Sequence, residues 1–385
     1  MSLETAFWVC LGWVAYVYAG YPVLVWCLAR LAGRGIRKAD IEPRVTVLIA
    51  AFNEAREIEH TVVNKLQQDY PVERLEVIVV SDGSTDGTDA IVERLARSAG
   101  GKLRLLRQEP RQGKTMALNR AVPQATGEII VFADANSMYG PDAVRQLVRS
   151  FADPSVGYVT GQMVYTNPAG SGIGEGSGAY MRYENMLRVL ETRLHSVVGV
   201  DGGIDAVRRE LYMPMRADQL PDFVLPLNVI EKGRRAVYEP AAKVYEAALG
   251  AAHDEFRMRV RVSLRALWAL FDKRGLLSPV RDPLFAWQLF SHKVLRYAAF
   301  IPLAGLLGIN VLVAGHHPFY TGFLVLQLLA YGLAAAGPVL SRLRSVAPRL
   351  LAPYYFVLLN LACAAAFWKF LSGQKMVTWK PRGGS

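Results

Sequence analysis

The chain has 385 residues, which is more than one average domain needs and leaves room for a second structural part. Hydrophobic residues make up 52% of the chain, and its mean hydropathy of +0.18 is high for a soluble protein. A formal net charge of +11 suits a nucleic acid, a membrane surface or an anionic substrate as partner. The sequence contains no long Lys/Arg block and no nucleic-acid-binding motif, so we expect no nucleic-acid partner.

The apolar residues concentrate at the two ends of the chain, in four long runs without charges. About 20 helical residues cross the ~30 Å hydrocarbon core of a bilayer, so each run is a candidate transmembrane helix. The runs are the segment between Glu4 and Arg30, Tyr297–Gly315, Phe319–Leu340 and Leu350–Trp368. The three cysteines (Cys10, Cys27 and Cys363) lie in these runs without a CxxC pair, which indicates small hydrophobic residues rather than disulfides or metal ligands.

Basic residues set the expected orientation of these spans. Arg30, Arg34, Arg37 and Lys38 follow the first run, which predicts that the next segment lies in the cytoplasm. We therefore expect a multi-pass protein of the cell (inner) membrane with its polar middle in the cytoplasm. The expected parts are a transmembrane helix at 1–31, a cytoplasmic domain at 42–254, amphipathic interface helices at 255–293, three transmembrane helices at 294–373 and a tail at 374–385.

The basic tail is the one feature that disagrees with four spans. Four crossings place the loop with Arg342, Arg344 and Arg349 inside and the His316-His317 loop outside. They also place the tail outside, although it carries Lys375, Lys380 and Arg382. Either the charge rule is weak at the tail, or one C-terminal run is re-entrant or interfacial. The number of apolar runs carries more weight here than the side of the tail.

The segment from Glu255 to Arg281 mixes arginines with large apolar residues, as helices on a membrane surface do. A soluble amphipathic helix packed on the cytoplasmic domain explains this composition equally well.

The polar middle alternates short β-rich runs with helical ones. Expected strands are Val45–Ala51, Leu75–Ser81, Leu103–Arg107 and Glu128–Asp134, and expected helices are Ile58–Gln68, Thr88–Arg97 and Met116–Ala125. Such alternation predicts an α/β domain with a mostly parallel sheet and helices on both faces. Ligands of such sheets bind at the carboxyl ends of the strands.

Polar clusters follow three of the four expected strands. They are Phe52-Asn53-Glu54, Ser81-Asp82-Gly83-Ser84 and Asp134-Ala135-Asn136. An Asx turn or a helix cap explains any one of them, but three at successive strand ends indicate a binding site. Gly113-Lys114 opens a helix, where a lysine can meet a phosphate group beside exposed backbone N–H groups. A solvated loop lysine is the alternative.

Taken together, these stretches resemble the nucleotide-sugar-binding half of family 2 glycosyltransferases, which have the GT-A fold. The resemblance rests on VTVLIAAFNEAREIEHTV, LEVIVVSDGSTDGT, RQGKTMALN and EIIVFADAN. With its apolar ends, the chain is most similar to the membrane-integrated branch that includes cellulose, hyaluronan and chitin-oligosaccharide synthases.

The resemblance implies roles for the residues at the strand ends. Asn53 and Glu54 would lie by the nucleoside, Asp82 would bond the uracil or ribose, and Lys114 would neutralise the diphosphate. Asp134 and Asn136 occupy the place of the DxD motif that holds Mg²⁺ or Mn²⁺, which offsets the charge of the leaving diphosphate. Because Asn136 stands where the motif has its second acid, the resemblance leaves room for weaker metal binding.

The resemblance extends downstream to the acceptor side. Gly202 and Gly203 would form the floor of an acceptor site, where small residues let a sugar approach the backbone. Asp205 is unusual in that segment, and it either binds acceptor or faces solvent. Asp222 would be the base that takes the acceptor's proton, with a helix N-cap as its alternative role.

Processive relatives carry a Gln-x-x-Arg-Trp motif before their later spans. Arg261 aligns with the Arg and could clamp diphosphate, while Met258 and Val262 replace the Gln and the Trp. Trp268 lies two turns further on. This departure weakens the case for a processive polymerase more than the case for sugar transfer.

The leading hypothesis is an inverting transferase that moves a hexose or N-acetylhexosamine from a UDP-sugar to an extracellular polysaccharide (an exopolysaccharide), with membrane lipids around its spans. Transfer of a single sugar to a lipid acceptor is the alternative. A non-catalytic membrane subunit with the same fold is disfavoured, because Asp82, Asp134 and Asp222 are all present.

Overall fold

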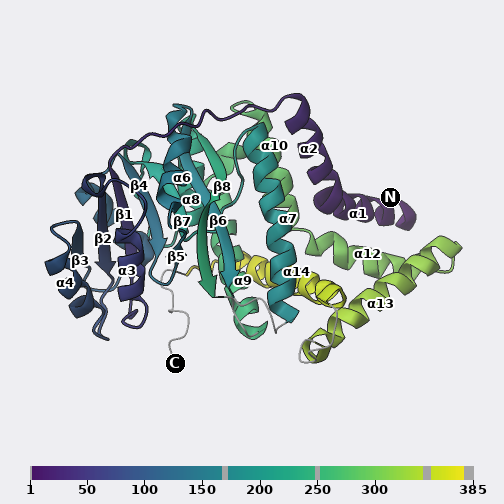
Figure 1. Cartoon of the computed structure of the whole chain (residues 1–385). Coiled ribbons are helices and arrows are strands. Elements are labelled where there is room, and N and C mark those ends of the chain that lie inside the picture. Colours follow the sequence, from purple (N-terminus) through teal and green to yellow (C-terminus); the bar gives the residue numbers. More distant parts are fainter. Residues whose placement is uncertain (1, 167–171, 248–251, 341–347, 377–385) are drawn as a thin grey trace. The chain divides into compact units, whose positions relative to one another are not determined.

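The computed structural model describes residues 2–166, 172–247, 252–340 and 348–376 (Figure 1). The chain forms two compact units. One, the sheet unit, contains residues 34–166, 191–246 and 375–385; the other, the helical unit, contains residues 1–33, 167–190 and 247–374. The expected domain boundaries did not anticipate two features of this division. Residues 167–190 group with the helical unit, and Lys375 groups with the sheet unit.

The sheet unit is built on one eight-stranded sheet with the strand order β3-β2-β1-β4-β7-β6-β8-β5. The strands are β1 Val45–Ala51, β2 Leu75–Ser81, β3 Leu103–Arg107, β4 Ile129–Asp134, β5 Met138–Tyr139, β6 Val156–Thr166, β7 Ile204–Arg208 and β8 Arg235–Ala247. The first four match the predicted strands to within a residue, and β3-β2-β1-β4 are parallel. The second half joins them through antiparallel β7, so the sheet as a whole is mixed.

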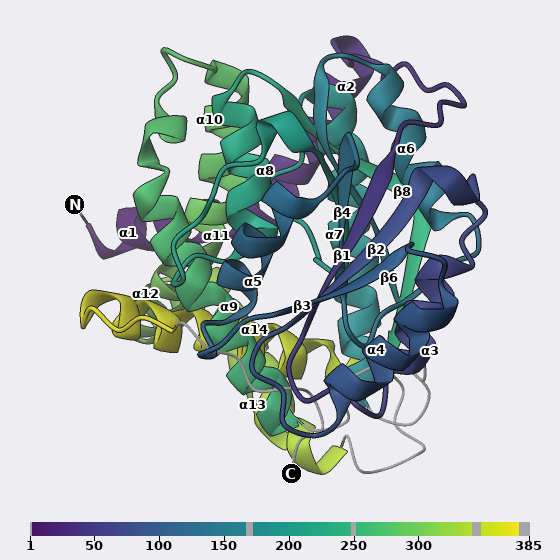
Figure 2. The ribbon, with the colours of Figure 1, turned by 90° about the vertical axis from the view of Figure 1, so that its left-hand side faces the viewer.

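Helices cover both faces of this sheet, as its apolar strands require (Figure 2). Those of the sheet unit are α3 Ile58–Leu66, α4 Thr88–Ser98, α5 Lys114–Ala121, α6 Ala143–Arg149 and α8 Pro221–Glu231. Val62 of α3 and Leu147 of α6 join the same buried cluster as Val47 and Val131 of the sheet. The opposite face packs against α5 and α8. This two-layer cover holds the strand ends in fixed positions.

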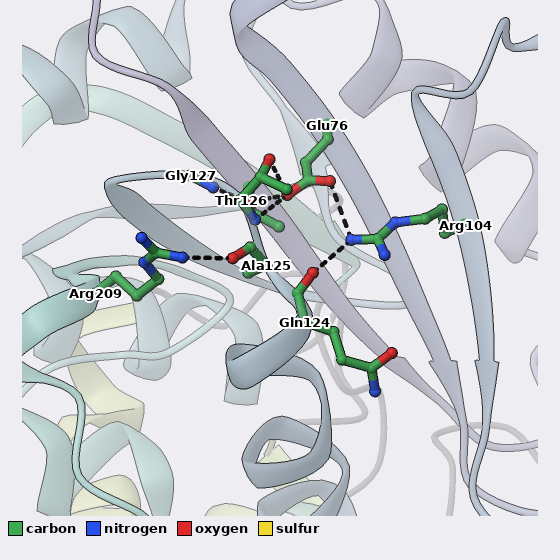
Figure 3. A network of polar contacts seen from close by, with 8 residues as sticks. Glu76, Arg104, Gln124, Ala125, Thr126, Gly127 and Arg209 are labelled. Carbon is green, nitrogen blue, oxygen red and sulfur yellow. Dashed lines mark hydrogen bonds and ion pairs between the residues drawn. The ribbon is translucent and has the colours of Figure 1, made fainter.

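At the amino ends of the strands, a polar network links β1, β2 and β3 to the loop before β4 (Figure 3). Glu76 of β2 accepts hydrogen bonds from Thr126 N at 2.6 Å, from the hydroxyl of Thr46 and from Arg104 at 3.2 Å. The same Thr46 hydroxyl accepts from Gly127 N at 2.8 Å. A Cβ on Gly127 would lie 2.4 Å from Thr46 N, so only glycine fits. The network fixes the loop that feeds β4 and its terminal Asp134.

The helical unit consists of long helices and shorter segments around them. They are α1 Leu3–Ala15, α2 Tyr21–Leu31, α7 Gly172–Leu194, α9 Ala252–Asp272, α10 Pro283–Leu289, α11 Leu295–Tyr297, α12 Phe300–Val313, α13 Pro318–Leu340 and α14 Ala352–Leu371. A π-helical turn, Tyr16–Gly20, connects α1 to α2. Buried Glu184 of α7 pairs with Arg296 of α11 at 2.6 Å, which explains why most of α7 belongs to this unit.

In the described part of the chain, three helices are long and apolar enough to cross a membrane: Leu3–Leu31, Pro318–Leu340 and Ala352–Leu371. The predicted second span, Tyr297–Gly315, corresponds to α12, which has only 14 residues and is bent by 54° from the preceding Pro283–Tyr297 segment. The predicted number of four is reached only if this bent pair is one span. Leu326 and Leu329 of α13 are 62% and 66% exposed, as lipid-facing residues would be. Arg342 and Arg344 of the predicted basic loop lie outside the described residues.

The predicted amphipathic segment begins with α9, and its apolar face is already covered. Val260 and Leu264 pack against Ala362 and Ala366 of α14. Trp268 donates a hydrogen bond to Gln374 O at 2.8 Å. The apolar stripe of α9 therefore pairs with a candidate span inside the helical unit, a partner that neither sequence interpretation named.

Candidate active site

The loops after β1 and β2 are bonded to each other, which brings two of the predicted polar clusters together. Asn53 has a positive φ of 54°, a conformation that asparagine tolerates better than most residues. Its side-chain oxygen accepts from Thr85 N at 2.9 Å, and its own N–H donates to the Ser84 hydroxyl at 3.1 Å. Glu54 N donates to the Thr88 hydroxyl at 2.9 Å. Asn53 thus shapes the loop through its own side chain.

Asp82 is fully buried, and its carboxylate holds the loop that leads to Lys114. One oxygen accepts from the Gln108 side chain at 2.6 Å and from Gln112 N at 2.8 Å; the other accepts from Gly113 N at 3.0 Å. These are bonds that a nucleoside would have to share or displace. A role of Asp82 toward uracil or ribose stays a prediction, while its role in ordering the loop is visible.

Arg111 is a residue of this site that the sequence interpretation missed. Its guanidinium carbon lies 3.4 Å from the centre of the Phe52 ring, a cation–π contact. Its Nε is 3.6 Å from the Asp82 carboxylate. Arg111 therefore adds a cation between the loops after β1 and β2. Its place in the Arg-Gln-Gly-Lys loop beside Lys114 was the available signal.

Lys114 joins the two acids on which the predicted chemistry depends. Its ammonium group lies 2.7 Å from Asp134 Oδ1 and 3.5 Å from Asp222 Oδ1. Burial lowers the pKa of Lys114, but the two carboxylates outweigh it and hold that pKa above its usual value. The lysine is therefore charged, and it links the end of β4 to the start of α8.

Asp222 lies in the first turn of α8 rather than at its cap. The helix begins at Pro221, a favoured first position, and Leu220 is the N-cap residue. The alternative role of Asp222 as N-cap is therefore wrong.

Gly202 and Gly203 lie directly beside these acids, both with positive φ (80° and 76°). A Cβ on Gly202 would lie 2.9 Å from the Asp222 carboxyl carbon, and one on Gly203 would lie 3.1 Å from Glu246 and 3.7 Å from Asp134. The two glycines thus leave the space in which the carboxylates stand. This closeness to Asp222 and Asp134 agrees with their expected place at the acceptor floor, although acceptor binding itself stays a prediction.

Glu54 is partly buried and is influenced by the negative charge of Asp134. Burial, and then the charge of Asp134, raise the pKa of Glu54 to about 7. An acid with such a pKa is partly protonated near neutrality, and a cationic or hydrogen-bonding ligand would stabilise its charged form.

Asp205 does not face solvent: it is 1% exposed on β7. It lies opposite Thr160 of β6 and Phe132 of β4 in the sheet. Burial and the nearby charge of Asp222 raise the pKa of Asp205 to about 8. The solvent-facing alternative for this residue is therefore wrong, while acceptor binding stays a prediction. The protonated form of Asp205 is the one that the fold favours at neutral pH.

The residues at the end of β4 fit a divalent cation that is shared with a substrate. The described residues contain no group of three or more His, Cys, Asp or Glu that could hold a metal ion by themselves. Mg²⁺ and Mn²⁺ in such sites are bound by one or two protein oxygens together with substrate phosphates and water. Asp134, whose side chain is 37% exposed, and the partly buried Asn136 offer that donor set.

Arg261 belongs to the helical unit, where it is on α9. The other predicted site residues belong to the sheet unit. The proposed clamp of Arg261 on a diphosphate remains a prediction.

The sheet with its parallel half and the loops at its carboxyl ends has the GT-A fold. Residues 46–213 match the model of glycosyl transferase family 2. The chain therefore contains a glycosyl transferase family 2 domain, as the sequence motifs predicted.

Three similar proteins match this chain over different shares of its length. The solved structure of the mannosyltransferase PcManGT from Pyrobaculum calidifontis, in complex with GDP-Man and Mn²⁺, has 27% sequence identity and a TM-score of 0.73 over 97% of this chain and 100% of that one. The beta-monoglucosyldiacylglycerol synthase of Synechocystis is 35% identical over 36% of this chain. The poly-beta-1,6-N-acetyl-D-glucosamine synthase of Staphylococcus aureus is 31% identical over 30% of it. The matches span 29% and 28% of these two relatives, less than a third of their length.

Proposed function

We propose that the chain catalyses inverting transfer of a hexose or N-acetylhexosamine from a nucleoside-diphosphate sugar to an acceptor hydroxyl. The observation that carries the proposal is the Lys114 ammonium group, which lies 2.7 Å from Asp134 and 3.5 Å from Asp222. Inverting transfer needs one base beside the attacking hydroxyl and positive charge beside the leaving diphosphate. This cluster supplies both at one edge of the sheet.

In the proposed reaction, Asp222 removes the proton of the acceptor hydroxyl as its oxygen bonds to the anomeric carbon. The bond from that carbon to the diphosphate oxygen breaks, and the electron pair stays with the nucleoside diphosphate. Lys114 offsets the negative charge that develops on the diphosphate, while Gly202 leaves room for Asp222. Arg261 is a second candidate cation for the diphosphate.

A divalent cation would be held by Asp134 and Asn136 together with the diphosphate oxygens, and it would neutralise charge on the leaving group. The Mn²⁺ in the PcManGT complex supports such a dependence without distinguishing Mn²⁺ from Mg²⁺. Because Lys114 also binds Asp134, the cation and the lysine would share this carboxylate.

UDP-sugars are the donor class that the motifs favour, with Asn53, Glu54 and Asp82 near the nucleoside. The GDP-Man in the PcManGT complex, a protein that resembles this chain over nearly its whole length, makes GDP-mannose the second donor to test.

The proposed acceptor is a growing extracellular polysaccharide, and a membrane lipid is the second candidate. The similarity to a poly-N-acetylglucosamine synthase supports the first. The similarity to a glucosyldiacylglycerol synthase, and Met258 and Val262 in place of the Gln and Trp of the processive motif, support the second.

We also propose a multi-pass membrane protein with a cytoplasmic sheet unit. Lys375 follows the last helix, and its ammonium group lies 2.6 Å from Asp218 of the sheet unit. Lys375 then lies on the same side of the membrane as the sheet unit, which needs an even number of crossings between residues 246 and 375. Two crossings, by α13 and α14, with α12 not spanning, meet this condition. The re-entrant alternative for a C-terminal run is thereby favoured over four spans.

The full-length protein in detergent or lipid nanodiscs tests the reaction. UDP-glucose, UDP-N-acetylglucosamine and GDP-mannose are offered in turn, and release of the nucleoside diphosphate is measured with and without Mn²⁺ or Mg²⁺. Radiolabelled product is then separated into organic-extractable lipid and insoluble polymer. Failure to transfer sugar from any donor to either acceptor class would refute the proposal.

A further inference from the structure

The segment after the last helix is bonded to the loop that precedes the proposed base. Helix α14 ends at Leu371, and Lys375 Nζ lies 2.6 Å from Asp218 Oδ2. The other oxygen of Asp218 is 3.2 Å from Arg216 Nε. The Asp218 side chain is only 14% exposed, whereas that of Lys375 is 44% exposed. Although burial alone would raise it, these two cations hold the pKa of Asp218 below its usual value, so the acid is ionised.

This loop is in turn fixed to the helix that carries Lys114. The Thr115 hydroxyl donates to Gln219 O at 2.9 Å. Asn119, one turn further along α5, donates from its side chain to Met215 O at 2.6 Å and accepts from Met215 N at 3.0 Å. Two clamps therefore hold residues 215–219 against α5.

The same loop leads directly into α8. Gln219 also accepts from Arg216 N at 3.0 Å through its side chain, so the loop is closed on itself. Asp222 follows Gln219 by three residues, and its carboxylate lies 3.5 Å from Lys114. A displacement of residues 216–219 would therefore change the positions of both Asp222 and Lys114.

We propose that Lys375 is a positioning residue for sugar transfer: its ion pair with Asp218 fixes the loop that sets the separation of Asp222 from Lys114. The inference rests on the proposed function of that pair. The lysine is not among the residues proposed to bind donor or acceptor, so we expect it to act on the rate of transfer rather than on donor binding.

The size of the effect follows from geometry rather than from the strength of the ion pair. Because the Lys375 side chain is 44% exposed, we expect the ion pair to contribute little to stability, so its loss should leave the melting temperature nearly unchanged. Displacement of a catalytic group by about 1 Å can lower the rate by roughly a hundred-fold. We expect Lys375→Met to lower kcat by roughly ten- to a hundred-fold, with an unchanged dissociation constant for the nucleoside diphosphate.

The test is a double-mutant cycle on the full-length protein: Lys375→Met, Asp218→Asn and both together, with Lys375→Arg as the conservative variant. Lys369→Met, in the last turn of α14, is the matched control for loss of one positive charge. The kcat, the KM for acceptor, the affinity for the nucleoside diphosphate and the melting temperature are measured on each.

The expected result is that both single variants lose a similar factor in kcat, that the double variant loses no more, and that Lys375→Arg retains most of the rate. A Lys375→Met enzyme that turns over like Lys369→Met would overturn the inference, and so would additive losses in the double variant. In both of these cases the wild-type protein still transfers sugar. A wild-type protein without transfer from any donor rejects the proposed function, and this inference with it.

Discussion

Gly202→Ala tests the acceptor side of the site most directly, because the structure separates two consequences of the added methyl group. The first is backbone strain: Gly202 has φ +80°, and a left-handed conformation costs a non-glycine residue about 1–2 kcal/mol. The second is contact: the new Cβ would lie 2.9 Å from both Cγ and Oδ2 of Asp222, whereas ordinary contact begins at 3.4 Å. The carboxylate must therefore move by about 0.5 Å.

Gly233→Ala is the matched control. Gly233 has φ +72°, and a Cβ there meets nothing within 4 Å. Both variants should lose about 1–2 kcal/mol of stability through strain, which thermal unfolding measures. Only Gly202→Ala should lose transfer, by roughly ten- to a hundred-fold in kcat, with nucleoside-diphosphate affinity preserved. If the two alanine variants turn over sugar equally, the position of Asp222 does not govern the reaction, and the proposed base is in error.

Three further predictions concern single acids of the site. Asp134→Ala should abolish transfer and its metal dependence together, since the cation loses the one carboxylate of its motif; undiminished wild-type activity in excess EDTA would contradict the metal assignment. Asp222→Asn should lower the transfer rate by ~10²–10⁴-fold while nucleoside-diphosphate affinity and melting temperature hold, and a variant with normal turnover would remove Asp222 from the mechanism. Asp205 has a pKa raised from 3.8 to about 8 in the folded protein, so the unfolded chain releases its proton first and stability falls as pH rises between these values. The gain in melting temperature of Asp205→Asn over wild type should therefore grow from pH 5 to pH 8 and then level off, and a pH-independent difference would show that Asp205 is ionised in the fold.

Much of the sheet and its edge was predictable from local pattern. Buried parallel strands are continuous apolar runs, so β1 to β4 were visible as such, and a polar residue that follows such a run must lie at the strand's carboxyl end. That rule alone located Asn53, Asp82 and Asp134 at one edge. It could not give their partners. Asp82 bonds a loop some 30 residues away in the chain, whereas the family resemblance named only a nucleoside as its partner.

Membrane topology, too, was predictable from the sequence only in part. Apolar length and charge determined that the ends of the chain hold candidate spans, because the cost of burying charge in a bilayer is a property of the segment itself. Whether a segment crosses depends on its bends and on its neighbours. The 54° bend before α12 and the contact of Lys375 with Asp218 became visible only in the tertiary structure.

The sequence by itself thus determined the family, the parallel half of the sheet and the acids at its edge, because these follow from short runs of residues. Only the tertiary structure decided which acids are buried, which are paired and how closely. Asp205 is the clearest case: the sequence left open whether it faces solvent, and the structure shows that it is buried. Its neighbours in the sheet are Thr160 and Phe132 on adjacent strands, which are remote in the chain, so no local pattern contains that information.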